Sequence, residues 1–167
     1  MIEAKDIRAG YGDGADILTG ISLTAARREI VTILGPNGCG KSTLLKTIAG
    51  YLRPRAGTIS FDGTEVSTVP IHEKVRHHKV GYVPQTDNVF GTLTVAENIL
   101  LGARLIARQE KEERFTAMME QYPALASKKN RKASALSGGE RQILSLARAL
   151  IRPSRPMPYS GVMISWA

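Results

Sequence analysis

Residues 30–43 read IVTILGPNGCGKST, in which an apolar, β-branched run breaks into a glycine-rich segment and then becomes helical. The pattern GxxxxGKS at residues 35–42 is typical of a phosphate-binding loop. Its glycines let the backbone wind so that successive N–H groups point at a phosphate, and the following helix adds the positive end of its dipole. The sequence therefore predicts a buried strand at residues 30–34, then a phosphate loop, then a helix.

The residues of this loop are candidates for contact with a nucleotide. Lys41 supplies a point charge for the β and γ phosphates, and Ser42 carries the hydroxyl expected to ligate Mg²⁺. The alternative, a turn beside an exposed lysine, does not account for the strand before the loop and the helix after it. The predicted nucleotide-binding set is Gly35, Pro36, Asn37, Gly38, Cys39, Gly40, Lys41, Ser42 and Thr43.

The segments around the loop alternate between strand and helix patterns. Strands are predicted at residues 17–23, 57–63 and 80–83, the second of them closed by an Asp-Gly turn. The helix after Lys41 is expected to end at Gly50. From residue 93 the composition becomes helical, beginning with a capping box at Thr94 and Glu97. The chain is thus predicted to carry a helical insert.

A second motif, LSGGERQ, occupies residues 136–142. Ser137 is the predicted N-cap, and Gly138 and Gly139 leave the first-turn amides of the next helix uncovered, so that a large anion can reach them. On its own this segment could be an ordinary, well-capped helix start. Paired with the phosphate loop, it is predicted to be a second phosphate contact.

Together the two motifs resemble those of the ATP-binding subunits of ATP-binding cassette (ABC) transporters, and the resemblance covers residues 1 to about 152. It implies an α/β fold, a P-loop NTPase core of RecA-like type at about 1–90 with an inserted helical subdomain at about 91–145. It also implies ATP and Mg²⁺ as cofactors. In that family the phosphate loop of one subunit and the second motif of another close on one ATP, which implies a head-to-tail homo- or heterodimer.

The same resemblance assigns two further residues. Tyr11 resembles the aromatic that stacks on adenine, and Gln85 resembles the glutamine that senses Mg²⁺ and the attacking water. The stretches YVPQ at 82–85, NVF at 88–90 and LTVAEN at 93–98 are most similar to subunits that energise branched-chain amino acid importers. The implied partners are integral membrane permease subunits, and the implied location is cytoplasmic, at the inner face of the cell membrane.

The sequence departs from the family after Arg152. There the family continues with an apolar strand ending in Asp-Glu, whereas residues 153–167 read PSRPMPYSGVMISWA and contain neither Asp nor Glu. Pro156 and Pro158 are incompatible with a central strand. We therefore expect a domain at 1–152 that is incomplete at its C-terminal side, followed by an aberrant tail, 153–167, from a frameshift or truncation. Hydrolysis by this chain is expected to be impaired, and a non-hydrolysing fragment is the alternative interpretation.

Composition sets the remaining limits. With 167 residues, 43% hydrophobic and 23% charged, the chain has a globular composition, and no apolar run approaches the roughly 20 residues of a membrane-spanning helix. The net charge of +8 raises a third interpretation, a nucleic-acid- or ribosome-associated ABC ATPase. The basic runs at 76–79 and 128–132 are not interleaved with aromatics, so a solvated surface is favoured and no nucleic acid is expected as a partner.

Overall fold

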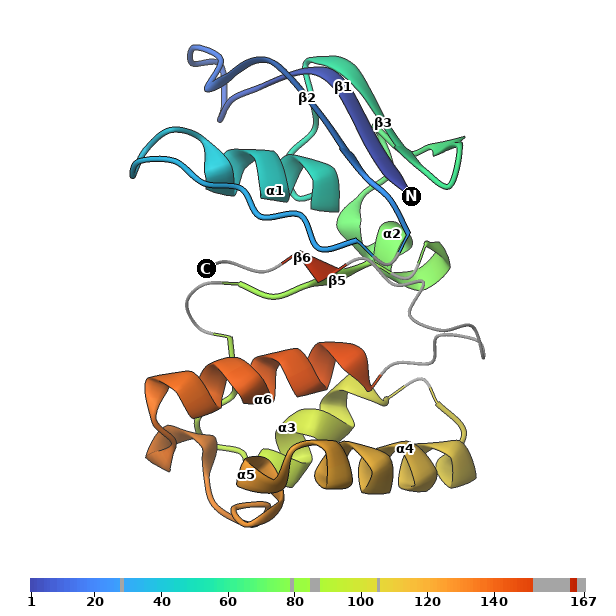
Figure 1. The fold of residues 1–167 in the computed structure, drawn as a ribbon, viewed down its shortest axis with the longest axis vertical. Helices are drawn as coiled ribbons and strands as arrows, with labels where there is room; N and C mark the ends of the chain where they lie inside the picture. Colours follow the sequence, from blue (N-terminus) through green and yellow to red (C-terminus); the bar gives the residue numbers. More distant parts are fainter. Residues whose placement is uncertain (28, 79, 85–87, 105, 152–162, 165–167) are drawn as a thin grey trace. The chain divides into compact units, whose positions relative to one another are not determined.

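The computed structural model describes residues 1–27, 29–78, 80–84, 88–104, 106–151 and 163–164 (Figure 1). They fall into two compact units. Unit 1 comprises the described residues of Met1–Val80 together with the short strand β6 (Met163–Ile164), and unit 2 comprises the described residues from 81 to 151.

Unit 1 is built on an antiparallel sheet with the strand order β2-β1-β3-β4. Its strands are β1 (Ile2–Ala9), β2 (Leu18–Ala25), β3 (Ala56–Phe61) and β4 (Thr64–Glu65). The predicted strands at 17–23 and 57–63 are confirmed as β2 and β3. The Asp-Gly turn is confirmed too, because Asp62 and Gly63 connect β3 to β4 in a hairpin.

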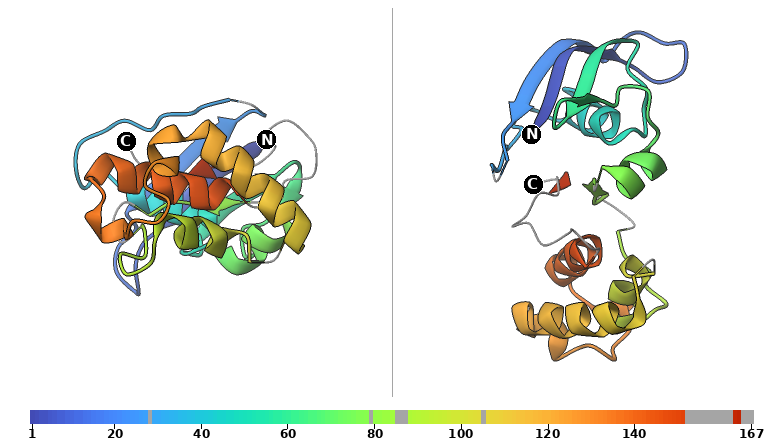
Figure 2. Two further views of the ribbon diagram at one scale, coloured as in Figure 1. Left: turned by 90° about the horizontal axis from the view of Figure 1, so that it is seen from below. Right: turned by 90° about the vertical axis from the view of Figure 1, so that its right-hand side faces the viewer.

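Two helices complete unit 1, α1 (Lys41–Ala49) and α2 (Ile71–His77). Helix α1 lies beside the sheet, as Figures 1 and 2 show. It ends as predicted at Gly50, whose N–H donates to the carbonyls of Lys46 (3.0 Å) and Thr47 (3.1 Å). The buried apolar side chains of this unit are Ile2, Ala4, Ile7, Ala9, Leu18, Leu44, Ile48, Ala49, Ile59, Phe61, Val66 and Val80.

The predicted buried strand at residues 30–34 is not present. This run has no regular secondary structure, and the side chains of Ile30 and Leu34 are 94% and 84% exposed. No strand among the described residues pairs with it. Because a strand forms only where a neighbour satisfies its backbone donors and acceptors, β-branched composition alone did not produce one here.

Unit 2 is mainly helical. It contains β5 (Gly81–Tyr82), α3 (Val95–Gly102), α4 (Arg108–Gln121), α5 (Pro123–Ala126), the 3-10 helix η1 (Ala133–Ala135) and α6 (Gly138–Leu150). Of the strand predicted at 80–83, two residues form β5. The capping box at Thr94 and Glu97 is confirmed, since the Thr94 Oγ1 accepts from the Glu97 N–H and the Glu97 carboxylate accepts from the Thr94 N–H.

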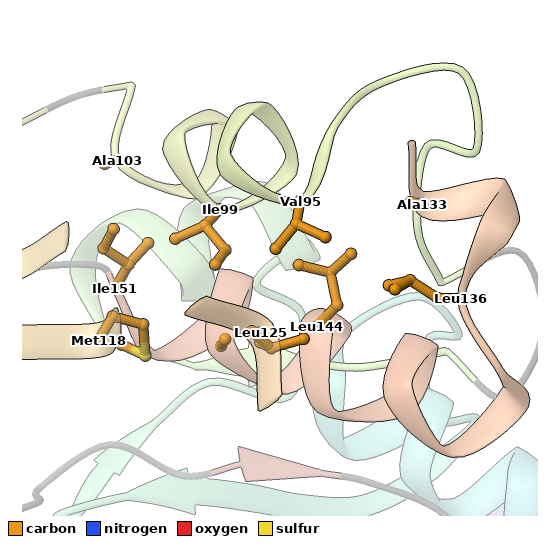
Figure 3. Close-up of a cluster of buried hydrophobic side chains, with 10 residues drawn as sticks. Val95, Ile99, Ala103, Met118, Leu125, Ala133, Leu136, Leu144 and Ile151 are labelled. Atoms are coloured by element: carbon orange, nitrogen blue, oxygen red, sulfur yellow. The ribbon is translucent and has the colours of Figure 1, made fainter. Parts of the chain in front are cut away.

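The helices of unit 2 enclose one hydrophobic cluster (Figure 3). Helices α3 and α6 form its two main sides, with Ile99 on one and Leu144 on the other, both fully buried. None of the described helices combines the length and the apolar character that a membrane crossing requires. The cluster contains Val95, Ile99, Ala103, Met118, Leu125, Ala133, Leu136, Leu144, Ala147 and Ile151.

Candidate nucleotide-binding site

The start of α1 lies where the sequence predicts a phosphate-binding loop to lead into a helix. Gly38 and Gly40 have φ angles of 84° and 94°, a left-handed conformation that favours glycine. Gly40 is the N-cap of α1, and no side chain caps this end. The first helical bond is from the Leu44 N–H to the Gly40 carbonyl (2.9 Å), so the first-turn amides at residues 41–43 remain available to an anion at the positive end of the helix dipole.

Lys41 lies within the loop that precedes it. Its ammonium donates to the carbonyls of Gly35 (2.7 Å) and Pro36 (2.8 Å), and its Nζ is 3.9 Å from the Cys39 Sγ. Backbone carbonyls of the glycine loop therefore fix the position of the Lys41 ammonium. Because this side chain is already ordered, a phosphate that binds in the loop costs less conformational entropy.

The two hydroxyl residues after Lys41 differ in environment. Ser42 is half-buried, and its hydroxyl has no hydrogen-bond partner among the residues that the structure describes. A hydroxyl free at this position suits Mg²⁺, which takes oxygen ligands and is commonly shared with nucleotide phosphates. Thr43 is only 4% exposed, and its carbonyl accepts from the Thr47 hydroxyl (2.7 Å). Its backbone N–H belongs to the first turn of α1 and is the group of this residue suited to a phosphate.

Tyr11 lies in the loop between β1 and β2 and is 48% exposed. Lys46, on α1, approaches it, with the Lys46 Nζ 5.5 Å from the ring centroid and 3.4 Å from the hydroxyl oxygen. The structure thus connects Tyr11 to the helix that begins at the phosphate loop. An exposed aromatic ring so connected could stack on a nucleotide base.

The second motif forms an open helix start in unit 2. The Ser137 Oγ accepts from the Glu140 N–H (3.3 Å), and the Glu140 carboxylate accepts from the Ser137 N–H (3.0 Å). Gly138 and Gly139 are exposed, with open space where a Cβ would lie. A hydrogen bond from Lys128, and then the one from the Ser137 backbone, lower the pKa of Glu140. The Glu140 carboxylate therefore stays ionised. The amides of Gly138 and Gly139 beside it are uncovered.

Gln85 lies outside the described residues, whereas Asn88 is held to α6 by two hydrogen bonds. The Asn88 amide donates to the Gln142 Oε1 (2.7 Å), and the Arg148 Nη2 donates to the Asn88 carbonyl (2.8 Å). The Arg148 guanidinium lies 5.1 Å from the Phe90 ring centroid. Sequence reasoning missed this network, because its partners lie more than 50 positions apart.

The sequence was also compared with known protein families. Residues 18–157 match the family model described as ABC transporter. The chain belongs to this family.

Among the relatives of this ABC-family chain are two branched-chain amino acid transport ATP-binding proteins. It is 39% identical over 152 residues to the probable LivF protein of Archaeoglobus fulgidus, and 34% identical over 151 residues to the high-affinity BraG protein of Pseudomonas aeruginosa. These matches cover 91% and 90% of the chain and 64% of each relative. A thiamine import ATP-binding protein, ThiQ of Brucella abortus, is 39% identical over 93% of the chain and 62% of the relative.

Solved ABC cassettes have the same fold. A nucleotide-free ATP-binding cassette matches with a TM-score of 0.78 and 26% identity, over 90% of this chain and 64% of that one. A dimeric cassette in a post-hydrolysis state with ADP and phosphate matches with a TM-score of 0.74 and 26% identity, over 90% and 69%. The predicted P-loop NTPase fold class is therefore confirmed.

Proposed function

We propose that this ABC-family chain binds ATP with Mg²⁺ at residues 35–43. The observation that carries the proposal is the uncapped start of α1, where Lys41 is held within the glycine loop. Free amides, a helix dipole and a fixed ammonium together suit a polyphosphate better than a small monovalent anion. Ser42 would share the Mg²⁺ with the nucleotide, Tyr11 would stack on the adenine, and Gln85 would sense the metal and the attacking water.

The proposed assembly is a dimer of two ATP-binding subunits with membrane permease subunits. The open helix start at Ser137, Gly138 and Gly139 would contact the nucleotide held by the phosphate loop of the other subunit. A solved relative is dimeric in a post-hydrolysis state, which supports this arrangement. In such an assembly the chain lies at the inner face of the cell membrane.

The proposed transported solute is a branched-chain amino acid. Two relatives are described as ATP-binding proteins for this transport, whereas others are described as importing thiamine or spermidine and putrescine. Uptake of labelled leucine, thiamine and putrescine by cells with and without the gene tests the assignment. Loss of thiamine or putrescine uptake with normal leucine uptake would contradict it.

Hydrolysis is a separate matter from binding. In this family an Asp-Glu pair after the second motif prepares the water and the metal, but Glu140 is the last acidic side chain among the 167 residues. We propose that a polypeptide of these 167 residues, assayed alone, binds ATP and releases phosphate far more slowly than ABC ATPases that carry this pair. Phosphate release at ordinary family rates would contradict this.

The binding proposal is tested by titrating the chain with MgATP in a calorimeter. Lys41→Ala removes the charge within the loop, and we expect the dissociation constant to rise about tenfold or more, since hydrogen bonds to charged groups are worth about 1.5–3 kcal/mol. Lys129→Ala, which removes an exposed lysine of unit 2, is the matched control and should leave binding unchanged. Equal affinities in all three proteins would refute the site.

A further inference from the structure

The loop that carries Tyr11 is held by one residue from a distant part of the chain. This loop spans residues 10–17, between the end of β1 and the start of β2. Its base is closed by a bond from the Ile17 N–H to the Ala9 carbonyl (2.8 Å), and the turn at its tip has one long bond, from the Gly14 N–H to the Tyr11 carbonyl (3.4 Å). These backbone bonds alone leave the tip weakly held.

The side chain of Arg55 holds the tip of this loop through three hydrogen bonds. Its Nη2 donates to the Gly12 carbonyl (2.5 Å), and its Nη1 donates to the Gly14 carbonyl (2.7 Å) and to the Asp16 Oδ1 (2.8 Å). The backbone of Arg55 is fixed in turn, because its N–H donates to the Arg8 carbonyl (2.7 Å) just before β3 begins. One planar guanidinium therefore joins three points of the loop to the sheet, a geometry that lysine cannot reproduce.

Lys46 contacts the Tyr11 side chain itself. It lies on α1, the helix that begins at the phosphate loop, and its ammonium lies over the Tyr11 ring and near the hydroxyl. A cation over an aromatic face is attracted to it, and this occupies one side of the ring. The loop is thus held by Arg55, and the ring by Lys46.

We propose that Arg55 and Lys46 are positioning residues for base recognition, which act through Tyr11 and touch no nucleotide themselves. The inference rests on the proposed function, in which the Tyr11 ring stacks on the adenine. Stacking requires the ring to be fixed at one distance from the phosphate loop, and ordering a mobile loop on binding would weaken the affinity. Here the loop is ordered before the base arrives.

The test compares two probes, MgATP and inorganic tripolyphosphate with Mg²⁺, which has the phosphates but no base. In Arg55→Gln we expect the dissociation constant for MgATP to rise about fivefold, within the range of base-stacking contributions, while that for tripolyphosphate changes less than about twofold. Tyr11→Ala should likewise raise the dissociation constant for MgATP and leave that for tripolyphosphate nearly unchanged. Combining the two substitutions should add little to either alone, because both remove one interaction.

The matched control is Arg53→Gln, two residues away. Arg53 is exposed and makes no side-chain hydrogen bond or ion pair with the residues that the structure describes, so its substitution should alter neither affinity. Lys46→Met, which keeps the length of the side chain, should weaken MgATP binding without affecting tripolyphosphate. Circular dichroism melting of each variant establishes that it is folded.

Two results would overturn the inference. One is an Arg55→Gln protein that binds MgATP as tightly as the wild type, and the other is an equal loss of affinity for both probes, which indicates damage to the whole unit. A wild-type chain that binds neither probe refutes the proposed function itself. Failure of the inference and failure of the function are therefore distinguishable.

Discussion

At the scale of single residues, Lys74 in α2 has an unusual environment. Its side chain is fully buried, its ammonium donates to the Ile48 carbonyl in the last turn of α1 (3.0 Å), and it lies 5.4 Å from the Phe61 ring centroid. Burial lowers the pKa of Lys74 to about 8. The carbonyl and the negative end of the helix dipole offset only part of the cost of removing this charge from water.

This environment predicts a pH dependence of stability. The folded chain releases the Lys74 proton near pH 8 and the unfolded chain near 10.5, so between these values the unfolded state binds more protons and the free energy of unfolding rises with pH. We expect a rise of about 2 kcal/mol between pH 7 and 10 from this residue. Lys74→Met should remove it, as measured by urea unfolding at both pH values.

The control for the pH experiment is Lys129→Met, which replaces an exposed lysine and should keep the wild-type pH dependence. An identical rise in the wild type and in Lys74→Met would show that Lys74 is not charged and buried as described. Because both variants lose one positive charge, the comparison removes the effect of net charge.

At the scale of elements, the loop before α3 depends on one buried amide. Asn98 is fully buried, its Oδ1 accepts from the Phe90 N–H (2.8 Å), and its Nδ2 donates to the carbonyls of Phe90 and Thr94 (both 2.9 Å). A helical residue thus satisfies the backbone of the loop that leads into its own helix. Removal of the amide would leave several of these groups buried and unpaired.

We predict that Asn98→Ala lowers the free energy of unfolding by about 3 kcal/mol, because an unpaired buried polar group costs about 1–3 kcal/mol and more than one is created. Asn130→Ala removes an exposed asparagine and should change stability by less than about 0.5 kcal/mol. Chemical denaturation of both variants measures the difference. A loss in Asn98→Ala no larger than that in Asn130→Ala would contradict the described role.

The elements also show what the sequence can and cannot predict. The capping boxes at Thr94 and Ser137 were predictable because both partners lie within one helical turn. The contacts of Arg55 and Asn88 were not, because they join residues about 40 to 60 positions apart and depend on the packed fold. Local chemistry can be read from the sequence directly, whereas side-chain networks require the structure.

At the scale of the whole molecule, the sequence predicted the family and the fold class, but its prediction of a buried strand at residues 30–34 was wrong. Residues 30–34 have the composition of a buried strand and yet are exposed and unpaired among the described residues. A strand is a property of two segments, so its own composition cannot guarantee it. The loop itself depends on Gly38, Gly40 and α1, which belong to unit 1, and it forms there without that strand.

The central claim is that phosphates bind at the amides of the phosphate loop, and hydrogen exchange with and without MgATP tests it most directly. Amides that bind an anion exchange more slowly, as other protected amides do. We predict that MgATP slows exchange at residues 35–43. Exchange at residues 10–16, around Tyr11, should slow by a smaller factor, and exchange in α4 should not change. Unchanged exchange at residues 35–43 in saturating MgATP, or protection confined to unit 2, would contradict the claim.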